Sequence, residues 1–149
     1  MEESKRDNIK NSLLTVLCNA TGIYRRTITA EQKKNYQIKL KEIIMRLTKK
    51  VDSDSITNKD IRNAIIGLRE FCGSIGASQK AINVYLKFYS VISNKKDLVL
   101  RELDCPIDSF VIKKNKLKKI ALSNLNLEDY EEMQNKLNHF RTTIRKTQF

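Results

Sequence analysis

The chain has 149 residues, which is enough for a domain with a sizeable hydrophobic core, and we expect residues 1–149 to form a single domain. It carries 29 Lys and Arg against 17 Asp and Glu, and this net charge of +12 indicates a polyanionic partner such as nucleic acid, unless it reflects a lysine-rich coding bias. No apolar run is long enough to span a membrane and the N-terminus has no signal-peptide core, so we expect a cytoplasmic protein without a membrane partner.

Apolar residues recur at helical spacing along almost the whole chain, with little Gly or Pro to interrupt them. The first helix is expected over residues 7–23. Thr29 and Gln32 form a capping-box pattern that begins a second helix. After the polar run 52–60, in which Thr57 is the expected N-cap, a third helix follows.

Gly73 and Gly76 indicate a tight turn after the third helix, and Ser78 is the expected cap of the fourth. The apolar spacing of the fourth helix predicts a buried face made of Ala81, Val84, Tyr85 and Phe88.

A loop over 93–96 and a short helix over 97–103 are expected next. Pro106 cannot continue a helix from its N-terminal side, so the residues around it should be extended, and Asp108 is the natural N-cap of the segment that follows. The last helix should run from about Leu127 to Lys146. The sequence therefore predicts a compact, all-α domain of six to seven helices.

Cys18, Cys72 and Cys105 are scattered, and His139 is the only histidine. No pair of these residues has metal-ligand spacing, so we expect free thiols, no metal site, no iron–sulfur cluster and no cofactor. The sequence also lacks a Gly-x-Ser-x-Gly elbow and a glycine-rich phosphate loop, which gives no support to a serine hydrolase or a nucleoside-triphosphate enzyme.

Two segments carry a family resemblance. SIGASQKAINVYLK, at 74–87, combines a glycine-containing turn with the start of a helix, and CPID, at 105–108, places an aspartate after a proline. Together they resemble the hairpin with its following helix and the later aspartate segment of the helix-hairpin-helix DNA glycosylases, the endonuclease III and archaeal 8-oxoguanine glycosylase superfamily. The resemblance places the hairpin motif at about 71–88 and the aspartate segment at about 105–112.

This resemblance implies that Lys80, expected in the first turn of its helix, is the nucleophile and that Asp108 is the essential carboxylate. The lysine would attack C1′ of the sugar, and the Schiff base would allow strand cleavage. The implied protein is a monomeric DNA glycosylase with AP-lyase activity that acts on double-stranded DNA in base-excision repair. Helix capping by itself also explains Asp108, and Asp104 and Glu102 are alternative carboxylates.

Contacts with the DNA backbone are expected from the turn and from the lysine-rich segment KKNKLKK at 113–119. These candidates are Gly73, Gly76, Ser78, Gln79, Lys113, Lys114, Lys116, Lys118 and Lys119. Tyr24, Tyr85 and Phe88 are candidates for stacking on an extruded base, although helical spacing favours a core position for Tyr85 and Phe88.

Two other classes of function fit the same composition. One is a non-catalytic, basic helical DNA-binding module that resembles the SAM-like core-binding domains of tyrosine recombinases. The other is a helical protein-interaction factor whose charge is incidental. Formation of a covalent adduct with DNA would separate the enzyme from both, and weak DNA binding at moderate salt would favour the interaction factor.

Overall fold

The structure is a computed structural model that describes residues 3–5, 7–8, 11–12, 29–72 and 74–148. The described residues confirm the predicted all-α fold, since they contain helices and connecting segments but no strand. Most of the first expected helix, 7–23, lies outside them. From residue 29 onward the elements are α2 (Ala30–Asp52), α3 (Asn58–Cys72), α4 (Ile75–Ile92), α5 (Lys96–Arg101), α6 (Ser109–Lys114), the 3-10 helix η2 (Leu122–Asn124) and α7 (Leu127–Gln148).

The predicted caps of α2 and α3 are confirmed. Thr29 Oγ1 accepts a hydrogen bond from the Gln32 amide at 3.1 Å, and Gln32 Oε1 accepts one from the Thr29 amide at 3.0 Å. At the start of α3, Thr57 and Asp60 make the same reciprocal pair at 3.2 and 3.0 Å. Each pair satisfies two amides that the first turn of a helix leaves without an intrahelical partner.

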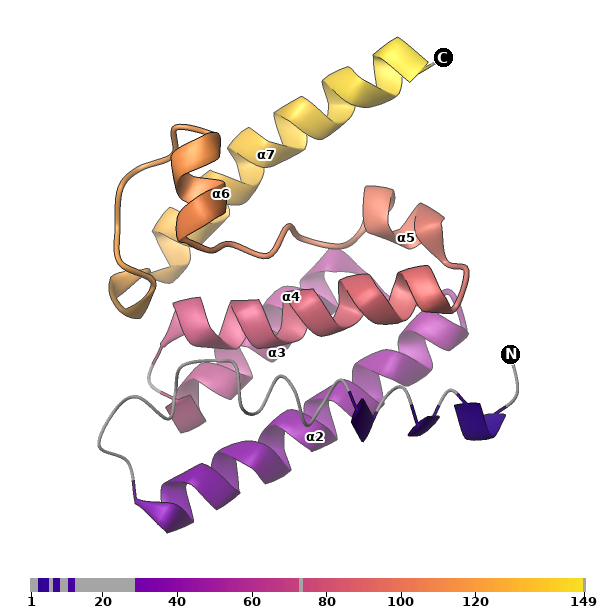
Figure 1. The fold of residues 1–149 in the computed structure, drawn as a ribbon, viewed down its shortest axis with the longest axis vertical. Coiled ribbons are helices and arrows are strands. Elements are labelled where there is room, and N and C mark those ends of the chain that lie inside the picture. The colour runs from indigo at the N-terminus through magenta and orange to yellow at the C-terminus, as the bar shows by residue number, and fades with distance from the viewer. Residues whose placement is uncertain (1–2, 6, 9–10, 13–28, 73, 149) are drawn as a thin grey trace.

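Helix α4 is the central element of the described fold. It contacts α2, α3, α5, α7 and η2. Figure 1 shows α4 between α2 and the connection from α5 to α6, with α3 crossing behind it. The core is formed by the apolar stripes of these helices, which include Tyr36, Leu40, Ile44, Ile61, Ile65, Leu68, Ala81, Tyr85, Leu86, Tyr130 and Met133.

The predicted start of α4 is wrong. Ser74, and not Ser78, is the N-cap, and its Oγ accepts a hydrogen bond from the Ala77 amide at 3.2 Å. The helix therefore begins at Ile75, so Gly76 and Ser78 lie inside it and Lys80 lies in its second turn rather than its first. Ser74 and Ser78 are both residues of a type that can cap a helix, so the sequence alone did not distinguish between them.

Gly76 is needed for close packing rather than for a turn. A Cβ at this position would overlap the backbone carbonyl of Leu122, so only glycine allows η2 to approach the first turn of α4 this closely. The predicted core position of Phe88 is also wrong, because its ring is 50% exposed and lies on a stripe of α4 with Lys87 and Val91, which are exposed as well. None of the helices in the described ranges is long and apolar enough to cross a bilayer.

Candidate functional site

Two buried glutamines hold the connection between α5 and α6, residues 102–108. Gln79 of α4 donates from Nε2 to the Ile107 carbonyl at 2.6 Å and accepts from the Ile107 amide at 3.0 Å. Gln134 of α7 makes the equivalent pair with Cys105, at 2.7 and 3.0 Å. Each carboxamide bonds to both the N–H and the C=O of one residue, as the backbone of a neighbouring β-strand would. Pro106, between the two paired residues, has no N–H that needs a partner.

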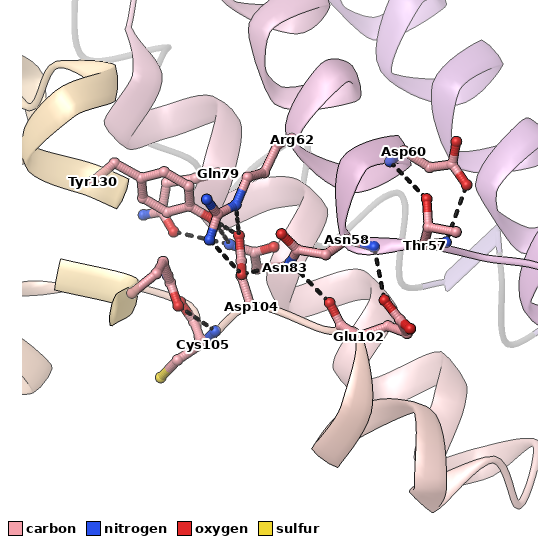
Figure 2. A network of polar contacts seen from close by, with 11 residues as sticks. Thr57, Asn58, Asp60, Arg62, Gln79, Asn83, Glu102, Asp104, Cys105 and Tyr130 are labelled. Atoms are coloured by element: carbon pink, nitrogen blue, oxygen red, sulfur yellow. Dashed lines mark hydrogen bonds and ion pairs between the residues drawn. The ribbon is translucent and has the colours of Figure 1, made fainter. Parts of the chain in front are cut away.

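Asp104 is the charged centre of this connection. Its carboxylate is almost fully buried and accepts hydrogen bonds from Arg62 at 3.3 and 3.4 Å, from Asn58 Nδ2 at 2.8 Å, and from the Tyr130 hydroxyl. Figure 2 shows the carboxylate reached by side chains from α3 and α7. A buried carboxylate is tolerated only when it is paired and hydrogen-bonded in this way.

Tyr130 connects Asp104 to Gln79 through Asn83. Burial, and then the negative charge of Asp104, raise the pKa of Tyr130, so the hydroxyl stays protonated and donates to the carboxylate. Asn83 Nδ2 lies 3.0 Å from the Tyr130 hydroxyl oxygen and 3.2 Å from Gln79 Oε1. We call the set Asn58, Arg62, Gln79, Asn83, Asp104, Tyr130 and Gln134 the polar clamp.

The polar clamp also includes contacts between the N-terminus of α3 and Glu102. The Asn58 amide donates to Glu102 Oε2 at 3.0 Å, and Asn58 Nδ2 donates to the Glu102 carbonyl at 2.9 Å. Side chains of α3, α4 and α7 thus bind residues 102, 104, 105 and 107 of the connection. The result is a non-helical segment whose position relative to α3, α4 and α7 is determined at four points, which is the rigid support that a site on its end requires.

The two proposed catalytic residues lie next to one of these points. Lys80 follows Gln79 in sequence, and Asp108 follows Ile107. The Gln79 side chain bonds directly to the Ile107 backbone, so the two backbone segments lie close together. Both side chains are half-buried. Asp108 Oδ1 accepts a hydrogen bond from the Val111 amide at 2.8 Å, which confirms the predicted N-cap of α6. Neither a hydrogen bond nor an ion pair joins Lys80 to Asp108 in the described chain.

The turn residues predicted to contact DNA are not on the surface. Ser78 and Gln79 are fully buried, with Ser78 Oγ donating to the Ser74 carbonyl at 2.7 Å, and Gly76 is covered by Leu122. A phosphate cannot reach these groups in this arrangement, so their assignment to a DNA-binding surface is corrected to a packing role. Gly73 lies outside the described residues.

The lysine-rich segment is on the surface, as expected for an electrostatic contact. Lys113, Lys114, Lys116, Lys118 and Lys119 are all exposed. Only one of them makes an ion pair with a described residue: Lys118 Nζ lies 3.2 Å from Asp129 Oδ1. Ile112 and Leu117 are buried and anchor the segment to the core, so its position is defined although its charges face solvent.

Among the candidates for base stacking, Tyr85 is a core residue, as its spacing favoured. Its ring is fully buried, its hydroxyl lies 3.1 Å from Thr48 Oγ1, and it stacks on Tyr89 with ring centroids 5.8 Å apart. Neither face of the Tyr85 ring is therefore accessible to a nucleic-acid base. Phe88 is exposed, and Tyr24 lies outside the described residues.

No role was predicted from the sequence for three residues of the polar clamp, Asn58, Arg62 and Gln134. A usable signal was present for Gln134, because it lies beside Met133 and four residues after Tyr130, on an otherwise apolar stripe. A polar side chain on such a stripe needs a buried partner. No group of three or more His, Cys, Asp or Glu side chains that could hold a metal ion occurs within the described ranges.

The polar clamp, the neighbouring Lys80 and Asp108, and the exposed lysines therefore define the candidate site by geometry alone. The chain matches no protein-family model, no curated protein and no solved structure.

Proposed function

We propose that the protein is a DNA glycosylase with AP-lyase activity that uses Lys80 as nucleophile and Asp108 as the stabilising carboxylate. The pairing of Gln79 with Ile107 is the observation that supports this most directly. It brings together two segments that are distant in sequence, and each contributes to the solvent-accessible surface the one residue that the reaction needs. The exposed lysines 113, 114, 116, 118 and 119 follow Asp108 and supply the charge for backbone phosphates.

In the proposed reaction the Lys80 nitrogen forms a bond to C1′ while the N-glycosidic bond breaks and its electron pair leaves with the base, which takes up the proton that the attacking nitrogen loses. The C1′–O4′ bond then opens to give the protonated imine, with O4′ taking up a proton, and loss of a C2′ proton breaks the C3′–O bond and releases the 3′ phosphate by β-elimination. The Asp108 carboxylate stabilises the positive charge that develops on the sugar. Its hydrogen bond from the Val111 amide fixes its position and leaves its second oxygen available for this role.

The direct test is borohydride trapping. The protein is incubated with labelled duplexes that carry an abasic site or one of a panel of oxidised, alkylated and deaminated bases, with and without borohydride. We expect a covalent protein–DNA adduct that forms only with borohydride, because the imine is reduced to a stable amine. Absence of an adduct with every duplex, including the abasic one, contradicts the proposal.

Asp108 has a capping role and a proposed chemical role, and replacing it with asparagine separates them. Asparagine is as good an N-cap as aspartate, so the free energy of unfolding should change little. Loss of the charge should slow base release by about 10²-fold, since a group aimed at developing charge acts mainly in the transition state. The measurement is single-turnover excision on the duplex identified by trapping, alongside urea unfolding. Full activity of Asp108→Asn would assign the aspartate to capping alone.

A non-catalytic DNA-binding module is the second candidate. It is favoured by two observations: no hydrogen bond or ion pair joins the described Lys80 and Asp108 side chains, and the Asp108 carboxylate already caps α6. This candidate predicts salt-dependent DNA binding without any trapped adduct.

A further inference from the structure

Phe110 is the most exposed large apolar side chain of the described residues. Its ring is 67% exposed, although it lies in α6 between Asp108 and the buried Ile112. The short helix turns Ile112 toward the core and Phe110 toward solvent. A single exposed apolar side chain is common on a protein surface, so this ring indicates a binding site only together with its surroundings.

The surroundings of this ring are strongly basic. Five exposed lysines follow within nine residues of Phe110: Lys113, Lys114, Lys116, Lys118 and Lys119. Lys114 Nζ lies 5.7 Å from the centroid of the Phe110 ring. The sequence contains no Asp or Glu between Ser109 and Asn126. A purely apolar partner would cover the ring but leave the surrounding lysine charges without counter-charges. A nucleic acid offers both aromatic bases for the ring and phosphates for the lysines.

The end of α6 places one of these lysines in an unusual conformation. Lys116 has a φ of 52°, in the left-handed region that glycine and asparagine favour, while the other two non-glycine residues with positive φ in the described ranges are Asp54 and Asn94. Its amide donates to the Lys113 carbonyl at 3.3 Å and the Leu117 amide donates to the Ile112 carbonyl at 3.0 Å, which closes the helix. A glycine would serve this turn with less strain but would contribute no charge.

We propose that α6 and the turn after it bind single-stranded nucleic acid, with the Phe110 ring stacked on an unpaired base and the lysines on the flanking phosphates. Base–aromatic stacking needs a free base face, which a closed duplex does not present. The flanking lysines then contribute a salt-dependent attraction. This inference rests on the proposed function only in taking nucleic acid as the partner, and it does not require Lys80.

The test compares Phe110→Ala with Phe71→Ala by fluorescence anisotropy. Phe71 is a matched control because it is also exposed, at 42%, and has Lys39 Nζ 5.6 Å from its ring centroid, but it lies at the end of α3 outside the lysine-rich segment. The probes are a labelled oligothymidylate of about 16 nucleotides and a hairpin duplex of similar length. We expect Phe110→Ala to weaken oligothymidylate binding about tenfold, in line with the loss of one stacked base.

The same variant should leave duplex affinity and the salt dependence of binding nearly unchanged, while Phe110→Trp should retain single-strand affinity. Charge reversal at Lys113 and Lys119 should instead flatten the plot of log K against log salt for both probes. Phe71→Ala should bind like the unmodified chain.

Equal oligothymidylate affinity in Phe110→Ala and the unmodified chain would overturn the inference, as would equal losses on both probes or no binding of oligothymidylate at all. These outcomes are separate from failure of the proposed enzyme function, which is read from borohydride trapping. A Lys80-dependent adduct combined with Phe110-independent binding would overturn the stacking site alone. Phe110-dependent binding without any adduct would support the stacking site and reject the glycosylase.

Discussion

Borohydride trapping should be lost when Lys80 is replaced by glutamine. The imine can form only at a primary amine, and glutamine keeps the length and polarity of the side chain while removing that amine. Lys80 is half-buried in the second turn of α4 and makes no described hydrogen bond, so the substitution should not disturb the helix. The measurement is the yield of adduct on the abasic duplex.

The matched control for this variant is Lys87→Gln. Lys87 lies on the same side of α4, about two helical turns further on, and it is exposed. It should trap as well as the unmodified chain. Binding of the abasic duplex should be nearly equal in both variants, because each loses one charge out of 29. Trapping that persists in Lys80→Gln would assign the nucleophile to another amine.

Replacing Asp104 with alanine should lower the free energy of unfolding by about 3 kcal/mol. The change leaves Arg62, Asn58 and the Tyr130 hydroxyl without their common acceptor, and breaking a buried ion pair from one side costs about 3–5 kcal/mol. The lower end applies because 22% of the Arg62 side chain is exposed and water can hydrate part of its charge. Urea unfolding followed by circular dichroism measures the change.

Glu132→Ala is the control for this prediction. Glu132 makes an exposed i,i+4 ion pair with Lys136 at 3.5 Å, and such a pair contributes at most about 0.5 kcal/mol. Asp104→Asn should lie between the two, since asparagine retains an acceptor but loses the charge. Equal stability of Asp104→Ala and Glu132→Ala would show that the polar clamp does not hold the connection between α5 and α6 in solution.

The two experiments test different parts of one arrangement. The polar clamp fixes the connection that carries Asp108 against the helix that carries Lys80, through the bonds of Gln79 to Ile107. Because Asp104 is part of the clamp, Asp104→Ala should also misplace Asp108 and slow any excision. Lys80→Gln should act on the chemistry without changing the unfolding transition.

The sequence alone was sufficient for most of the local interactions. The predicted caps Thr29, Thr57 and Asp108 each bond to a group about one turn away, and all three are present, whereas the cap of α4 is Ser74 and not the predicted Ser78. The apolar stripes of α2 and α3 were predictable for the same reason, since a period of 3.6 residues is a property of the chain itself.

Only the tertiary structure decided what the polar and small residues of α4 contact and where its buried face ends. Gln79 and Gly76 were interpreted as DNA contacts, yet Gln79 pairs with Ile107 and Gly76 packs on Leu122, and both partners are remote in sequence. Phe88 was expected in the core and is exposed, because burial depends on which neighbours cover a stripe and not on its spacing alone. The sequence therefore determined the described helices and three of the four predicted caps, while long-range packing determined the polar clamp and which side chains remain free to meet a partner.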